Sequence, residues 1–169
     1  SYRLLEAISA AECELDDHLT QLQRSDLVRE KTRRPELEYM FKHSLTQEAA
    51  YSSLLIERRT EFHRKVGQAL EQLFSDRKPE VYGLLAHHFE AAGDQERAVA
   101  YWIQAGDKAR LEDALDEAVR SYQRALALLK QTGESEQTIK TWLKVGLCYQ
   151  TNFEFEQAHQ AYETAFTLG

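Results

Sequence analysis

The sequence predicts a mainly α-helical fold, in which an array of helical repeats follows a smaller segment with a short β-hairpin. Seven Gly and two Pro in 169 residues are too few for a turn-rich β architecture. Hydrophobic residues make up 43% of the chain and charged residues 29%, which is the composition of an ordered globular protein. In the C-terminal half, small and aromatic residues recur at helical spacing, which is typical of stacked helices.

Residues 1–43 predict two short amphipathic helices followed by a hairpin. In the second helix, Leu15 and Leu19 lie one turn apart on the apolar face. The runs 27–31 and 37–42 alternate in part and flank a polar turn that contains proline, which indicates a β-hairpin. Helix, helix and hairpin in this order predict a winged-helix-like segment.

Residues 44–79 predict a pair of connecting helices. Ser44 followed by Gln47 forms a capping-box pattern at the start of the first helix. We expect the break between the two helices near residues 55–57. A polar loop follows, and Pro79 suits the first turn of the next helix.

Residues 80–169 predict helical repeats. A small residue, an aromatic four positions later and an alanine three further on share one helical face, so that a neighbouring helix can approach closely. Gly93 is expected to end one helix in the left-handed conformation, whereas Phe153 stands at the matching place in the third copy and leaves that turn in doubt. We expect residues 95–111 to form one long helix shared between repeats. The motif occurs as Ala98-Trp102-Ala105, Ala118-Tyr122-Ala125 and Ala158-Tyr162-Ala165.

This pattern resembles the tetratricopeptide repeat, a helix–turn–helix unit that stacks into a superhelix. The stacking predicts that Ala98, Ala118 and Ala158 lie buried at helix crossings, while Ala161 lies on the surface. We expect the last helix to present Ala158, Tyr162 and other apolar residues to a following helix, so that the repeat array is incomplete at its C-terminal end. Self-association through this exposed terminal repeat is an open alternative.

Charge and cysteine content limit the partners and the compartment. The formal net charge is −7, and this acidic balance disfavours a polyanionic partner. Cys13 and Cys148 lie too far apart to form a metal or disulfide pattern, which favours a reducing, cytoplasmic location. Because no apolar run reaches the ~18 residues of a membrane span, no membrane partner is expected. The chain begins at Ser1 and its only methionine is Met40, so we expect it to be a piece of a larger protein.

The sequence predicts no catalytic, cofactor-binding or metal-ligating residues. The adjacent His87 and His88 point about 100° apart on a helix, so both cannot easily ligate one ion; we expect one to pack and the other to be solvated. His43 and His63 are expected to form hydrogen bonds where the winged-helix-like segment ends, and Cys148 to be a small core residue. The six histidines are His18, His43, His63, His87, His88 and His159.

Two groups of side chains could serve either the fold or the binding of a partner. Trp102 and Trp142 are expected to pack between helices rather than to form an aromatic ligand groove, although a concave repeat surface remains a plausible peptide site. A basic set is interleaved with Glu57 and Glu61, which favours a solvated, ion-paired helix face over a phosphate site or a contact with another domain. The basic residues are Arg58, Arg59, Arg64 and Lys65.

The same reasoning disfavours DNA binding by the winged-helix-like segment. Its candidate recognition helix carries four carboxylates and no Lys or Arg before Arg24, which opposes a phosphate backbone. Only the hairpin has suitable cations. The carboxylates are Glu12, Glu14, Asp16 and Asp17, and the hairpin cations are Arg29, Lys31, Arg33 and Arg34.

Two longer segments, FKHSLTQEAAYSSLLIERRTEFHRKVGQALE and AHHFEAAGDQERAVAYWIQAGDKA, resemble the region behind the ATPase module of bacterial signal-transduction ATPases with numerous domains. Many of these proteins are fused to class III adenylate/guanylate cyclases. The resemblance covers nearly the whole chain and implies a winged helix that leads into tetratricopeptide repeats. It rests on Phe41-Lys42-His43, Ala50-Tyr51, Leu54-Leu55, Arg58-Arg59, His63 and Leu85-Ala86-His87-His88-Phe89.

The resemblance implies a non-catalytic interaction and regulatory module that couples a repeat scaffold to an ATPase switch. The chain lacks the Gly-rich loop followed by Lys-Ser/Thr that cradles phosphates, and it lacks a recognisable set of cyclase aspartates. We therefore expect no enzyme activity and no cofactor, and a protein partner, either an ATPase domain in the same polypeptide or a separate protein or peptide. Two alternatives stay open: part of a transcription regulator whose winged helix contacts DNA, and part of an enzyme with a histidine-based metal site.

Overall fold

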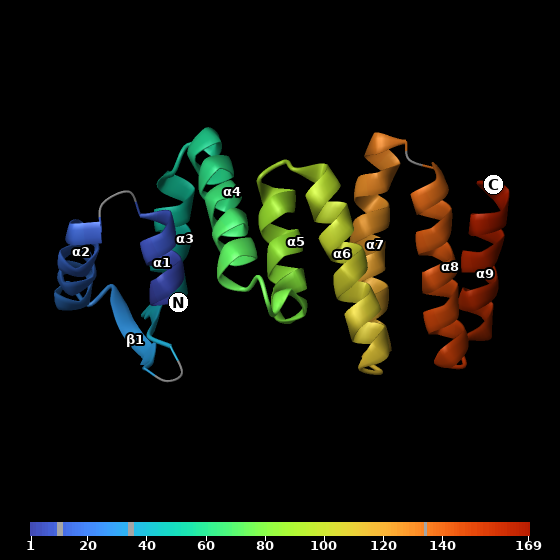
Figure 1. Ribbon diagram of the computed structural model, residues 1–169, viewed down its shortest axis with the longest axis horizontal. Helices are drawn as coiled ribbons and strands as arrows, with labels where there is room; N and C mark the ends of the chain where they lie inside the picture. The colour runs from blue at the N-terminus through green and yellow to red at the C-terminus, as the bar shows by residue number, and fades with distance from the viewer. Residues whose placement is uncertain (10–11, 34–35, 134) are drawn as a thin grey trace. The chain divides into compact units, whose positions relative to one another are not determined.

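The computed structural model describes residues 1–9, 12–33, 36–133 and 135–169. The regular secondary structure of these described residues is helical apart from one two-stranded antiparallel sheet (Figure 1), so the predicted mainly α-helical class is confirmed. None of the helices in the described ranges is both long enough and apolar enough to cross a membrane. The chain divides into two compact units, Ser1–Leu73 and Phe74–Gly169.

In the first unit, two helices lead into the predicted hairpin. Val28 pairs with Phe41 across the antiparallel strands, and the backbone N–H of Lys42 donates to the Leu27 carbonyl at 3.0 Å. The backbone N–H of Tyr2 donates to the Leu37 carbonyl at 2.7 Å, which ties the first helix to the loop before the second strand. That this segment belongs to a winged helix stays a prediction. The elements are α1 (Tyr2–Ile8), α2 (Glu12–Arg24), β1 (Val28–Thr32) and β2 (Glu38–Phe41).

The two connecting helices also belong to the first unit, and they break where the sequence predicts. The predicted capping box is wrong, because His43 is the N-cap residue and makes no side-chain cap bond, while Ser44 lies inside the helix. His43 continues from β2 in an extended conformation, so its carbonyl already accepts the N–H of Gln47 at 3.3 Å. The helices are α3 (Ser44–Ser53) and α4 (Ile56–Leu73).

The second unit is a row of five helices in which each helix packs against the next (Figure 1). Pro79 stands in the first turn of a short 3₁₀ helix that opens the row, as its fixed φ favours. The predicted long helix is confirmed, because α6 runs from Gln95 to Leu111 without a break. The elements are η1 (Lys78–Val81), α5 (Tyr82–Ala91), α6 (Gln95–Leu111), α7 (Leu115–Thr132), α8 (Ser135–Thr151) and α9 (Phe155–Thr167).

The row has a period of one helix rather than one helix pair. A residue with positive φ ends a helix at Gly93, Asp113, Gly133 and Phe153, so the left-handed turns are spaced evenly along the chain. The doubtful turn at Phe153 forms with a φ of 61°, although a side chain is strained in that conformation. The small–aromatic–small motif has the same spacing, since Thr138-Trp142-Val145 supplies a copy on α8. The middle repeat looks compressed because α6 belongs equally to both of its neighbours.

The alanines of the motif lie at helix crossings, as predicted. Ala98 and Ala118 are 0% exposed and Ala158 is 4% exposed. The prediction for Ala161 is wrong, because this alanine is 2% exposed and belongs to the core of α7 and α8. The expectation that Ala158 and its neighbours await a following helix is also wrong for the alanines: α9 packs on α8 and buries its alanine stripe there.

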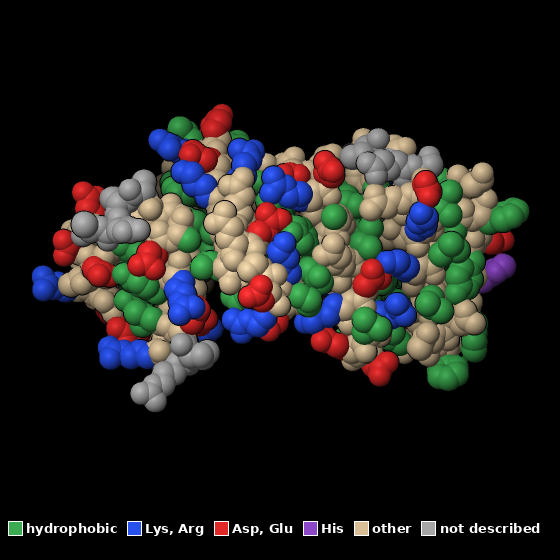
Figure 2. Space-filling model, viewed as in Figure 1, with side chains coloured by type: hydrophobic (Ala, Val, Ile, Leu, Met, Phe, Trp, Pro, Cys, Tyr) green, Lys and Arg blue, Asp and Glu red, His purple; other side chains and the backbone are tan. Residues whose placement is uncertain are grey.

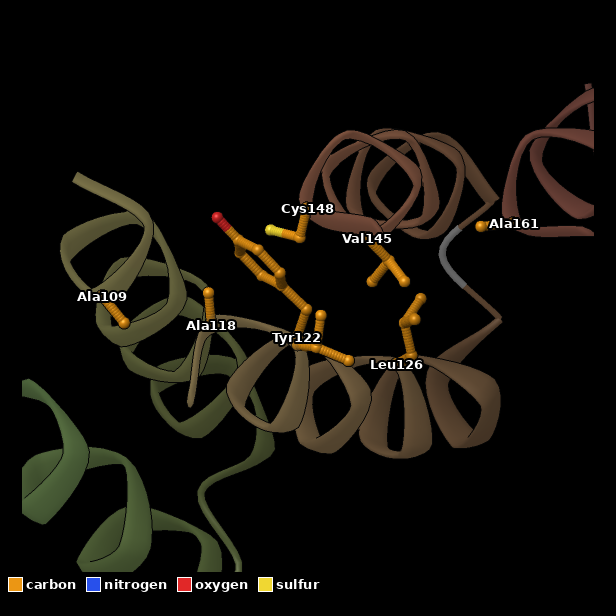
Figure 3. Packing of buried hydrophobic residues seen from close by; sticks show 8 residues of the cluster. Ala109, Ala118, Tyr122, Leu126, Val145, Cys148 and Ala161 are labelled. Atoms are coloured by element: carbon orange, nitrogen blue, oxygen red, sulfur yellow. The ribbon is translucent and has the colours of Figure 1, made fainter. Parts of the chain in front are cut away.

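The core between α7 and α8 is built from side chains that point toward one another. Figure 3 shows Tyr122 and Leu126 on α7 directed toward Val145 and Cys148 on α8. Tyr122 and Val145 are fully buried, and Cys148 is 1% exposed. Close packing of this kind is what fixes the spacing of neighbouring helices.

Two glycines allow tyrosine rings to lie directly on a helix backbone. A Cβ atom on Gly106 would lie 2.5 Å from Cε1 of Tyr122, and a Cβ atom on Gly146 would lie 2.5 Å from Cε1 of Tyr162. Glycine is needed at both positions because any side chain would overlap the ring. The same glycine–tyrosine contact therefore joins α6 to α7 and α8 to α9.

Candidate interaction surface

The helix row carries polar joints in which one acid, one aromatic ring and one cation come from three consecutive helices. In the first joint, the indole N–H of Trp102 on α6 donates to Oε2 of Glu90 on α5 at 2.8 Å. Arg124 on α7 donates to Oε1 of Glu90 at 3.2 Å, and its guanidinium carbon lies 6.0 Å from the Trp102 ring centroid. The glutamate thus holds both the ring and the cation.

The second joint repeats this arrangement one helix further along. The Tyr122 hydroxyl on α7 donates to Oδ1 of Asp107 on α6 at 2.7 Å, and Nζ of Lys144 on α8 donates to both Asp107 oxygens at 2.6 Å. Lys144 also lies 5.8 Å from the Tyr122 ring centroid. Burial, together with the Asp107 carboxylate, raises the pKa of Tyr122, so this hydroxyl stays a hydrogen-bond donor.

Sequence reasoning missed these joints, although a signal was present. The step from Trp102 to Tyr122 has the same length as the step from Arg124 to Lys144, so the cation moves along the chain with the aromatic ring. The pattern of small residues did not indicate this link between ring and cation, because that pattern concerns packing and carries no information about charge.

Trp102 and Trp142 both serve packing, as predicted, yet both also line surface hollows. Trp142 is half-buried against the α7–α8 core. With Leu126, Leu129 and Leu168 it lines a mainly apolar pocket of about 330 Å³. Trp102 lines a separate groove.

That groove crosses α5, α6 and α7 and is the candidate interaction surface. It has a volume of about 330 Å³. Leu84 on its α5 side is 53% exposed, so it offers an apolar contact at the edge of the groove. On the α6 side, Nζ of Lys108 lies 3.6 Å from the Glu112 carboxylate. Its polar lining is acidic in balance, with Glu80, Glu112 and Glu117 against Lys108.

The histidines do not gather into a site within the described part of the chain. His87 is exposed and His88 is half-buried, and their rings meet edge to face with centroids 5.5 Å apart. Nε2 of His63 lies 3.1 Å from the Tyr51 hydroxyl, which is a hydrogen bond between the connecting helices. Among the described residues, no group of three His, Cys, Asp or Glu side chains could hold a metal ion.

The cysteines are only partly covered by the structure. Cys148 lies in the core, where burial raises the pKa of its thiol. A raised pKa keeps the thiol protonated and weakly nucleophilic. The side chain of Cys13 lies outside the residues whose burial is described.

The basic set on α4 is bound within its own unit. Glu61 pairs with Arg58 at 3.4 Å and with Lys65 at 2.9 Å, and these partners hold the pKa of Glu61 below its usual value. Arg59 donates to the Leu54 and Ser52 carbonyls at 2.9 and 2.8 Å. It therefore closes the C-terminal end of α3, where carbonyl groups otherwise lack partners. Arg58, Arg59 and Lys65 thus have partners within the first unit.

Two of the hairpin cations suited to nucleic acid, Lys31 and Arg33, are paired as well. Lys31 lies 3.2 Å from Glu38, and Arg33 donates to Glu30 at 2.5 and 3.1 Å. Arg34 lies outside the described residues. On the candidate recognition helix, Asp16 accepts a hydrogen bond from the Tyr2 hydroxyl at 2.8 Å.

The chain is similar in sequence to a curated protein and distantly similar in fold to solved structures. No protein-family model matches the chain. An uncharacterized protein of Rhizobium meliloti (strain 1021) is 36% identical over 98 residues, which are 58% of this chain but only 10% of the relative's length. The crystal structure of BtubC (BKLC) from P. vanneervenii aligns over 73% of this chain and 52% of its own, with a TM-score of 0.49 and 17% identity. That of MamA aligns over 66% of this chain and 91% of its own, with a TM-score of 0.24 and 15% identity.

Proposed function

We propose that this chain is a non-catalytic protein-interaction and regulatory module of a larger cytoplasmic signalling protein of bacteria, and that it couples a helical-repeat scaffold to an ATPase switch. The observation that carries the proposal is the groove across α5, α6 and α7. Its rim combines the exposed Leu84 with an acidic balance of side chains. A segment that offers one apolar residue beside a Lys or Arg would satisfy both features.

Peptide selection tests the groove directly. The purified chain, immobilised, should enrich peptides with an aliphatic residue next to a cation from a random display library. Leu84→Asp and Glu112→Lys should each weaken binding of the selected peptides at least about tenfold. Glu156→Lys on α9 makes the same charge change at an exposed position away from the groove and should leave binding unchanged. Equal losses in all three variants, or no enriched motif, would contradict the groove as a binding site.

The regulatory half of the proposal concerns α3 in the first unit. No residue of α3 is buried, and Leu45, Leu55 and Ile56 on and just after this helix are more than 70% exposed. Exposed apolar side chains in one short segment favour contact with another domain. The resemblance to signal-transduction ATPases implies that this domain is the ATPase module.

Addition in trans tests this contact. An ATPase module of this class, mixed with the chain, should show altered ATP turnover and should bind the chain in a sedimentation experiment. Ile56→Asp should abolish both effects, whereas Gln68→Asp, an exposed position on the same α4 helix, should keep them. Unchanged turnover with the unaltered chain would contradict the coupling.

The proposal that the chain is non-catalytic rests on the absence of a phosphate-binding loop from the sequence. Phosphoryl transfer depends on positioned cations and a phosphate-binding loop, and the sequence has no such loop. The purified chain should therefore neither hydrolyse ATP nor form cyclic nucleotide with magnesium present. DNA binding is the alternative function, and it is disfavoured because Lys31 and Arg33 already have carboxylate partners. A DNA titration at low salt distinguishes the two.

A further inference from the structure

The helix α9 repeats a face of α7, and the two faces differ in whether a helix covers them. The α7 face consists of Leu115, Val119, Tyr122 and Leu126, which lie on one helical stripe and pack with α8. Forty positions later the corresponding α9 face consists of Phe155, His159, Tyr162 and Phe166.

The burial of the two faces is opposite. Tyr122 and Leu126 are 0% and 8% exposed under α8, whereas Phe166, the counterpart of Leu126, is 88% exposed and Phe155 is 65% exposed. Tyr162 and Phe166 also line a hollow of about 730 Å³ on α9, together with polar side chains that include His159 and Glu163. Figure 2 shows hydrophobic side chains gathered over α8 and α9. Isolated exposed apolar residues are ordinary, but a stripe of them on one helix marks a contact surface.

The surface continues onto α8. Tyr162 lies over Gly146, and its hydroxyl donates to the side chain of Gln150 at 2.9 Å. Leu143 and Leu147 share this side of α8 by helical spacing, and they are 46% and 42% exposed. The exposed face therefore spans both helices, as the covered face spans α6 and α7.

The covered face also shows which chemistry its occupant needs. Lys144 of α8 reaches across α7 and pairs with Asp107 on α6. The counterpart of Asp107 on the exposed face is Leu147, which offers no partner for an ammonium group. At this position a lysine of an occupant would lose water without gaining the carboxylate that Asp107 provides to Lys144, and this is unfavourable.

We propose that the face formed by Leu143, Leu147, Tyr162 and Phe166 is the docking site of an amphipathic helix that lies on α9 as α8 lies on α7, and that this helix carries an apolar side chain where α8 carries Lys144. The site is separate from the groove across α5, α6 and α7. The apolar side chain of Leu147 disfavours a charged residue of the occupant at the position of Lys144.

A peptide derived from α8 tests the proposal. The probe is a fluorescent peptide of residues 135–151 with Lys144→Leu, titrated into the purified chain and followed by anisotropy. It should bind at least about tenfold more tightly than the same peptide with Lys144 retained. Phe166→Asp in the chain should weaken binding by about the same factor. Gln157→Asp, on the opposite side of α9 and exposed, and Glu112→Lys in the groove should not.

A second design removes the requirement that a free peptide be helical. The same segment, joined after Gly169 through a flexible Gly/Ser linker, reaches the face at high local concentration. Hydroxyl-radical oxidation of Phe166 should then fall at least about threefold in the Lys144→Leu fusion and less in the fusion that retains Lys144. Equal oxidation of Phe166 in both fusions and in the unfused chain overturns the proposal. So does a chain that dimerises by sedimentation and becomes monomeric with Phe166→Asp, because the occupant is then a second copy.

Discussion

The second unit contains the same glycine–tyrosine contact between helices twice. A third helix covers one copy and leaves the other exposed. Gly106 on α6 contacts Tyr122 on α7, and α8 covers this contact and also supplies Lys144. Between α8 and α9, the contact of Gly146 and Tyr162 is present, but its ring stays half-exposed. The contact of two helices therefore sets the geometry, and the third helix supplies most of the burial.

The largest expected effect comes from placing a charge at the helix crossings. Ala118→Arg should destabilise the chain by about 4 kcal/mol, because the position is fully buried and the new side chain overpacks the core. Ala158→Arg should cost about 2 kcal/mol, since α9 packs mainly on α8 and can shift outward. Urea denaturation of both variants measures the difference. Equal losses of unfolding free energy in the two variants would show that Ala118 and Ala158 are equally confined by their neighbours.

Next in size is the glycine pair. Gly106→Ala should cost about 2 kcal/mol, because the added methyl meets a ring that cannot move, whereas Gly146→Ala should cost under about 1 kcal/mol. Gly83→Ala is the matched control: nothing lies within 4 Å of its Cβ position, so it should stabilise α5 by about 0.5 to 1 kcal/mol. Thermal melts rank the three variants. A Gly106→Ala protein as stable as Gly83→Ala would show that the ring does not lie on the backbone.

These contacts between helices show how far the sequence could predict the fold. The small–aromatic–small pattern predicted the buried Ala98 and Ala118 and the long helix α6, because these features depend on local spacing along one helix. The environment of Ala161 could not be predicted in this way. An alanine on α9 is buried or exposed according to which side of that helix a neighbour covers, and this depends on the packing of α8.

The turns offer a smaller contrast at matching positions. Gly93 and Phe153 both adopt the left-handed conformation, with φ of 72° and 61°. Phe153→Gly should stabilise the chain by about 1 kcal/mol because it relieves this strain, and its 80% exposed ring contributes little burial. Gly93→Ala has open space for its methyl and should destabilise by about 1 kcal/mol. If both substitutions leave the melting temperature unchanged, these positions are not left-handed.

The smallest effect concerns the two tyrosine hydroxyls. Tyr122→Phe should cost about 1 kcal/mol, because its hydroxyl is buried against Asp107, and Tyr162→Phe under about 0.5 kcal/mol. The raised pKa of Tyr122 adds a pH dependence. Above pH ~10 the unfolded chain releases this proton while the folded chain keeps it, so the stability of the unaltered chain falls as pH rises. Tyr122→Phe should fall less steeply between about pH 10 and 11.5 than the unaltered chain, and parallel slopes would contradict the assigned burial.

The open and closed copies differ most directly in how solvent reaches their rings. Hydroxyl-radical footprinting of the unaltered chain, read by mass spectrometry at single residues, compares Tyr122 with Tyr162 and Phe166 in one sample. Tyr122 should be protected, Phe166 strongly oxidised and Tyr162 intermediate, in the order of their exposure. If Phe166 is as well protected from oxidation as Tyr122 in the isolated chain, the face on α9 is not exposed. The distinction between the covered and the exposed glycine–tyrosine contact would then be wrong.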